Sequence, residues 1–233
     1  MSFLKFFGFG AAATGALLVQ FALVSAVLLP VKKMSTKNVN NIKAVYLLAT
    51  TQEKIDGAKW YSSAHKIALN LADDYGLTLQ TVAGVIASLS PRNKWSKNVI
   101  DAENLIETFV RDPDNAVNVK VSTFNKNKDR ALKILRNNQD FFTDNTREIL
   151  SGPKLNEFFN CILGVEDVCI DGHAYCIFNG SRTSLKDVPS IGVKLRAEIK
   201  SDFKKAAAKF KISPTEMQAI TWVTWRRIYG VKD

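Results

Sequence analysis

Hydrophobic residues along most of the chain recur at the three- and four-residue spacing of amphipathic helices, whereas alternating strand patterns are scarce. Residues 82–89 place apolar side chains on one face of a predicted helix, which Ser90-Pro91 ends. We therefore expect an all-α fold in which short helices pack on one another. The same spacing predicts helices over residues 98–110, 127–138, 154–163, 195–210 and 214–228, and the polar residues 111–121 predict a loop.

The beginning of the chain has a different pattern, because residues 6–31 contain no charged side chain. This apolar segment is long enough to span a bilayer as a helix, which takes about 20 residues. Lys32 and Lys33 follow it, so an anchored chain would keep residues 34–233 in the cytoplasm. Alternatively, translation starts at Met34, and the whole protein is cytoplasmic. Both alternatives stay open, and a cleaved signal peptide is disfavoured because no small-x-small site precedes the lysines.

These patterns divide the chain into three parts. Residues 1–33 are the apolar N-terminal segment, residues 34–54 a linker with a first helix, and residues 55–233 a helical domain. The length suits one or two domains.

Positive charge exceeds negative charge, with 32 Lys and Arg against 22 Asp and Glu and a net charge of +10. Only Lys5, Lys32 and Lys33 flank the apolar segment, so most of the surplus belongs to the helical domain. A surplus of this size favours nucleic acid or an anionic membrane surface as the partner, although it also serves solubility.

The three cysteines, Cys161, Cys169 and Cys176, are too few and too irregularly spaced for a disulfide framework, a zinc site or a four-cysteine iron–sulfur cluster. We interpret them as buried thiols in a reducing compartment, and we expect no metal and no cofactor.

Residues 149–175 carry the candidate chemistry. A tight turn at Ser151-Gly152-Pro153 leads into a helix that opens with Lys154, and an apolar connection then leads to Asp171. Taken singly, the lysine fits a solvated surface position and the aspartate fits a helix N-cap. Their placement at the two ends of one apolar helix and its connection lets an amine and a carboxylate meet in a cleft. Burial would make such a lysine a better nucleophile.

The pattern resembles the helix-hairpin-helix (HhH-GPD) superfamily of base-excision DNA glycosylases, the endonuclease III class, over residues 55–230. Four stretches carry the resemblance in the family's order: residues 81–92, like the early helix ending in an "LS" loop; residues 124–135, like the aromatic-Asn-x-x-Lys-Ala-x-x-Ile helix; residues 150–154, at the place of the "LPGVG" hairpin and its lysine; and residues 169–173, like "VDTH". The hairpin differs here, because Pro153 lacks an N–H group.

The resemblance implies a compact multi-helix glycosylase fold without the iron–sulfur cluster, acting as a monomer on double-stranded DNA. Asp171 would be the catalytic carboxylate, and Lys154 the Schiff-base lysine of a bifunctional glycosylase and abasic-site lyase. Without Lys154 in the pocket, the enzyme would be monofunctional. The implied DNA contacts are Ser90, Pro91, Arg92, Asn93, Trp95, Lys126, Lys128, Ser151, Gly152, His173, Arg226 and Arg227.

Two other functions stay open at this point. One is a DNA-binding module that has the same fold and no catalysis. The other is a membrane-tethered protein, held by residues 6–31, whose basic face binds lipid headgroups.

Overall fold

In the computed structural model, the described part of the chain is residues 36–137 and 145–231. These residues form ten α-helices, one short 3-10 helix and no strand, which confirms the all-α prediction for them. Judged by length and hydropathy, none of the described helices could span a membrane. The apolar segment of residues 6–31 lies outside the described residues. The helices are α1 (Lys37–Leu47), α2 (Thr51–Tyr75), α3 (Leu79–Leu89), α4 (Trp95–Arg111), η1 (Asn115–Asn118), α5 (Asn125–Asn137), α6 (Thr146–Leu150), α7 (Pro153–Ile162), α8 (Gly172–Asn179), α9 (Val193–Phe210) and α10 (Pro214–Ile228).

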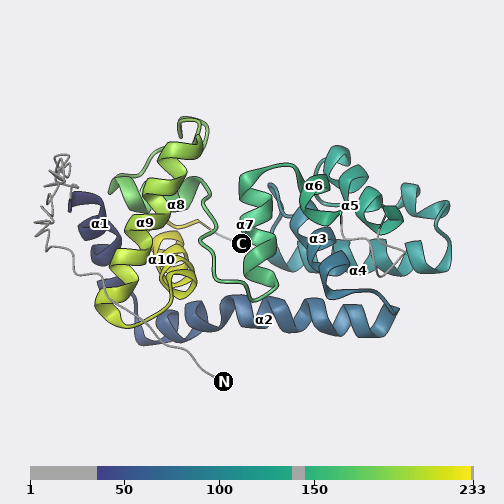
Figure 1. Cartoon of the computed structure of the whole chain (residues 1–233), viewed down its shortest axis with the longest axis horizontal. Coiled ribbons are helices and arrows are strands. Elements are labelled where there is room, and N and C mark those ends of the chain that lie inside the picture. The colour runs from purple at the N-terminus through teal and green to yellow at the C-terminus, as the bar shows by residue number, and fades with distance from the viewer. Residues whose placement is uncertain (1–35, 138–144, 232–233) are drawn as a thin grey trace, which may run out of the picture. The chain divides into compact units, whose positions relative to one another are not determined.

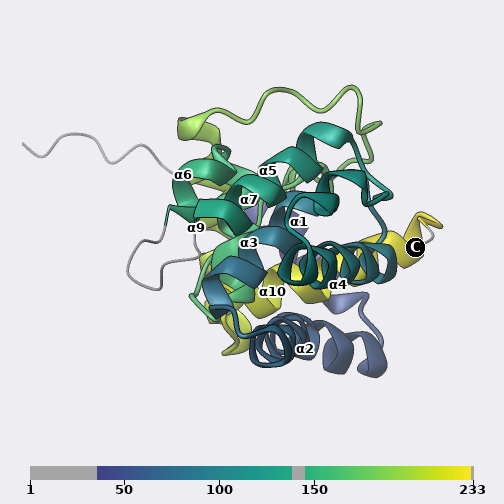
Figure 2. The ribbon, with the colours of Figure 1, turned by 90° about the vertical axis from the view of Figure 1, so that its right-hand side faces the viewer.

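The helices form two groups, each around its own apolar core (Figure 1). In one group, α3 lies among α4, α5, α6 and α7. In the other, α1, α8, α9 and α10 pack together. The long helix α2 contacts both groups, through α3, α4 and α7 on one side and α10 on the other. Figure 2 shows α2 along the lower edge of the molecule, with α10 just above it. Any cleft between the two groups therefore has α2 as its common floor.

Helix α3 is the centre of the first group. The sequence predicted one apolar face for it, which describes only part of its burial. Every residue from Thr81 to Leu89 is buried, so the helix has no solvent face. Gly84 allows this packing, because a Cβ added there would lie 2.4 Å from Cγ2 of Thr146 on α6. A helix surrounded by others needs small residues on the sides that an amphipathic pattern assigns to water.

The expected division after residue 54 needs correction. Helix α2 starts at Thr51, so that boundary would cut its first turn, which a capping box between Thr50 and Glu53 closes. Helix α1 packs on α8, α9 and α10 with Ile42 fully buried. Residues 36–54 are therefore part of the helical body. Hydrophobic periodicity missed α2 because its core side is mostly alanine and glycine, which carry little hydrophobic signal.

Local signals located several helix ends correctly. Ser213 caps α10 through a capping box with Glu216, and Pro214 is the first residue of the helix, as predicted. Asp171 caps α8. The expected loop over residues 111–121 contains the short helix η1, which is a correction of detail.

Candidate functional site

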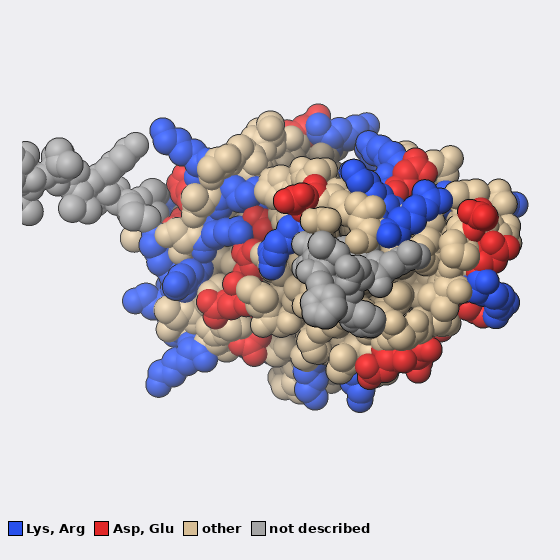
Figure 3. Space-filling model, turned by 45° about the vertical axis from the view of Figure 1, so that its right-hand side comes forward, with Lys and Arg blue, Asp and Glu red and all other residues tan. Residues whose placement is uncertain are grey.

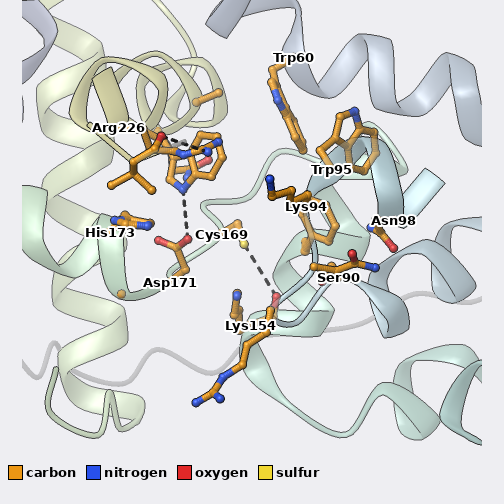
Figure 4. A pocket seen from close by; sticks show the side chains of 18 of the residues that line it. Trp60, Ser90, Lys94, Trp95, Asn98, Lys154, Cys169, Asp171, His173 and Arg226 are labelled. Carbon is orange, nitrogen blue, oxygen red and sulfur yellow. Dashed lines mark hydrogen bonds between the residues drawn. The ribbon is translucent and has the colours of Figure 1, made fainter. Parts of the chain in front are cut away.

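A cleft of about 360 Å³ has walls from both groups of helices. One wall comes from α8 and α10, the other from α2, α7 and the connection between α3 and α4 (Figure 4). Eight of the residues predicted for catalysis or DNA binding line it: Asp171, Lys154, Ser90, Arg92, Asn93, Trp95, His173 and Arg226.

Asp171 stands at the N-terminus of α8, with both carboxylate oxygens held. Oδ1 accepts a hydrogen bond from the Ala174 N–H at 2.8 Å, and Oδ2 accepts one from the Trp222 indole N–H at 3.1 Å. The residue is therefore a helix cap and a cleft residue at once. Each carboxylate oxygen can accept more than one bond, so the fixed group keeps acceptor capacity toward the cleft.

Lys154 lies in the first turn of α7, directly after Pro153, and is half-buried. It lines the same cleft as Asp171 (Figure 4). The connection that leads to Asp171 contacts the start of α7, because Sγ of Cys169 lies 3.9 Å from the backbone oxygen of Lys154. Lys154 and Asp171 therefore line one cleft.

Aromatic rings line much of the cleft. The Trp60 ring centroid lies 5.0 Å from that of Trp95, 5.9 Å from that of Phe158 and 6.3 Å from that of Trp222. Only Trp95 was expected here. Trp222 could have been suspected, because it projects from α10 beside the apolar face and not within it. Trp60 lies on α2, a helix that the periodicity did not reveal. Such rings offer flat apolar faces to a planar ligand.

The charges around the cleft are mostly positive. Lys94, Arg92, Arg226 and Lys154 line it, against the single carboxylate of Asp171. The Arg226 guanidinium lies over the Trp222 ring, 4.4 Å from its centroid. A cleft with this balance favours an anionic ligand that also has a flat aromatic part.

Two cations expected on DNA are engaged within the protein instead. Arg227 forms an ion pair with Glu53 on α2, Nε to Oε1 at 2.6 Å, and joins α10 to the start of that helix. Lys128 donates to the backbone oxygens of Val117 at 2.6 Å and Val119 at 3.0 Å, which holds η1 against α5. Neither side chain lines the cleft, and sequence alone does not separate a cation that holds helices together from one that faces a cleft.

Four further predicted DNA contacts, Pro91, Lys126, Ser151 and Gly152, do not line the cleft. The backbone oxygen of Pro91 accepts a hydrogen bond from the Thr123 hydroxyl at 2.7 Å, and Lys126 is exposed on α5. Ser151 has a left-handed φ of 53° in the turn between α6 and α7. This is the tight turn that the sequence predicted before Lys154. The three cysteines are free and buried, as predicted.

Burial lowers the pKa of His173, and Arg226 and Lys154 lower it further, whereas the nearby Asp171 carboxylate opposes them. Folding therefore disfavours the imidazolium and favours the neutral imidazole. An unfolded chain binds this proton more readily, so His173 reduces stability as the pH falls below its unfolded pKa of about 6.5.

We expect wild-type protein to lose stability more steeply than a His173→Asn variant between pH 7.5 and pH 5.5. The check is urea unfolding of both proteins across this range. Subtracting one plot of unfolding free energy against pH from the other cancels the contribution of the carboxylates that both proteins contain. Parallel curves would show that the folded protein holds His173 no differently from the unfolded chain.

The fold and cleft define a class: an all-helical protein with an aromatic-lined cleft that presents one carboxylate among several cations. A family of unknown function (DUF7178) matches residues 28–228, and the chain belongs to this family. No curated protein and no solved structure matches the chain.

Proposed function

We propose that the protein is a DNA glycosylase of the helix-hairpin-helix type, with Asp171 and Lys154 as catalytic residues. The observation that carries the proposal is that both residues line one aromatic-lined cleft, although they lie at opposite ends of α7 and its connection. On this proposal the α6–α7 turn is the hairpin of the family, and the substrate is double-stranded DNA bound by a monomer.

The cleft suits an extruded base. Chemistry on a base needs it out of the stack, and its flat face then needs new partners. Trp60, Trp95 and Trp222 supply aromatic surface for stacking, and the cations at the cleft suit the flanking phosphates. The face in Figure 3 carries Lys and Arg side chains at several places, with acidic groups between them. Binding should therefore weaken as salt is raised.

The chemistry proceeds in steps. The bond between C1′ and the base breaks, the base leaves with the electron pair and takes a proton from water, and the Asp171 carboxylate stabilises the positive charge left on the sugar. Lys154, as the neutral amine, attacks C1′. The C1′–O4′ bond then breaks, O4′ takes a proton from the new ammonium, and an iminium ion forms. Water takes a C2′ proton, and the electron pair of that C–H bond expels the 3′ phosphate. If Lys154 does not attack, a water molecule bonds to C1′ and gives its proton to Asp171.

Borohydride trapping tests this function directly, because borohydride reduces the iminium to a stable amine. We expect wild-type protein to form a covalent product with duplex DNA that contains an abasic site, and Lys154→Ala to form none. Duplexes with uracil, 8-oxoguanine or an alkylated purine are run beside it to identify the excised base. Lys204→Ala is the control, since this exposed lysine of α9 lies outside the cleft and is not among the expected DNA contacts.

Each outcome separates the alternatives. Alkali-labile sites without a trapped product would indicate a monofunctional glycosylase. Salt-sensitive DNA binding with neither product would leave the non-catalytic binding module. Binding to anionic vesicles without binding to DNA would support the membrane-tethered protein.

A further inference from the structure

A buried ion-pair network lies directly behind the proposed catalytic pair. Glu157 is 3% exposed and lies on α7, one turn after Lys154. Its Oε2 lies 2.5 Å from Nη1 of Arg196, and its Oε1 lies 2.9 Å from Nζ of Lys200. Both cations come from α9, so the network joins the helix of Lys154 to the second group of helices.

The side chains of Glu157 and Arg196 also hold the backbone of Ile170, the residue before Asp171. The Ile170 N–H donates to Oε2 of Glu157 at 3.0 Å, and Nη1 of Arg196 donates to the Ile170 carbonyl at 3.3 Å. Both backbone polar groups of Ile170 are therefore taken by one ion pair. Ile170 itself is buried, and the next residue is Asp171.

Stability alone is a weak reason for this arrangement. Burial raises the pKa of Glu157, against the effect of its two cations, and the buried Nε of Arg196 has no hydrogen-bond partner in the described structure. Removing such charges from water costs much of the free energy that their attraction provides. A protein with apolar residues of the same volume in their place is often as stable. What apolar residues could not do is hold the N–H and C=O of Ile170.

We propose that Glu157, clamped by Arg196, is a positioning residue that sets the place of the Asp171 carboxylate relative to Lys154. This inference rests on the proposed function of the cleft. Because α7 carries both Lys154 and Glu157, the lysine and the N–H of Ile170, the residue before Asp171, are held by the same helix. A shift of that peptide would move Asp171 but leave Lys154 in its place.

The test compares Glu157→Ala and Glu157→Gln in two reactions. We expect Glu157→Ala to slow base release by about 100-fold, the loss typical of a misplacement near 1 Å, while trapping on a preformed abasic site stays close to wild type. Glu157→Gln keeps an acceptor for the Ile170 N–H and should recover part of the loss. Asp202→Ala is the matched control, because it removes a buried, ion-paired carboxylate of α9 that pairs with Lys205.

A second readout does not need catalysis. The Trp222 indole N–H donates to Asp171, so its NMR signal reports the position of that carboxylate. The signal, assigned with Trp222→Phe, should shift in Glu157→Ala and not in Asp202→Ala. Normal base release with an unshifted signal overturns the proposal. So does a parallel loss of both reactions that matches the loss of folded protein. Wild-type protein without either reaction would remove the proposed function, and the indole signal would still decide whether Glu157 positions Asp171.

Discussion

Asp171→Asn is expected to bind damaged duplex DNA about as tightly as wild-type protein while releasing the base at least about 10³-fold more slowly. Asparagine caps a helix as well as aspartate does, so α8 should still form. What the variant loses is the negative charge, and Asp171 is the only acidic residue that lines the described cleft. Without it, the positive charge that develops on the sugar meets only cations and neutral groups.

The measurement pairs single-turnover base release with a binding titration at one salt concentration. Asp187→Asn, an exposed residue between α8 and α9, serves as the control. If affinity falls in step with rate, Asp171 binds DNA and does not act on the sugar. If the rate is unchanged, another group carries the reaction.

Gly57→Ala is expected to have the largest effect on stability, a loss of about 2 kcal/mol in the free energy of unfolding. A Cβ at this position would lie 2.5 Å from Cα and 2.8 Å from the backbone nitrogen of Ile220 on α10. Backbone does not rotate away as a side chain does, so α2 and α10 must separate. Overpacking of this kind costs about 3 kcal/mol, of which the better helix propensity of alanine offsets about 1 kcal/mol.

The contact between α2 and α10 at Gly57 also positions part of the cleft, because Trp60 follows Gly57 by one turn and Trp222 follows Ile220 closely. Denaturant unfolding measures the loss, and Gly192→Ala is the control, since nothing lies within 4 Å of the position of its added Cβ. A stability equal to that of wild type would mean that the two helices can move apart at little cost.

The candidate site was predictable where its signals are local. The cap at Asp171 and the turn before Lys154 depend on neighbours a few residues away, so they can be recognised in the sequence. The sequence also placed Lys154 and Asp171 at the two ends of one helix and its connection, and both line the cleft. Trp60 and Glu157 gave no such signal, because their partners lie on helices distant in the chain.

The sequence by itself determined the all-α class, several helix ends and the positive charge, since helical periodicity and capping act over a single turn or two. Tertiary structure alone decided the rest. It buried α3 from Thr81 to Leu89, brought Trp60 to the cleft, and placed Arg227 in an ion pair with Glu53. The physical reason is that these outcomes depend on how closely helix backbones approach one another. A small residue such as Gly57 controls that approach without leaving any hydrophobic pattern.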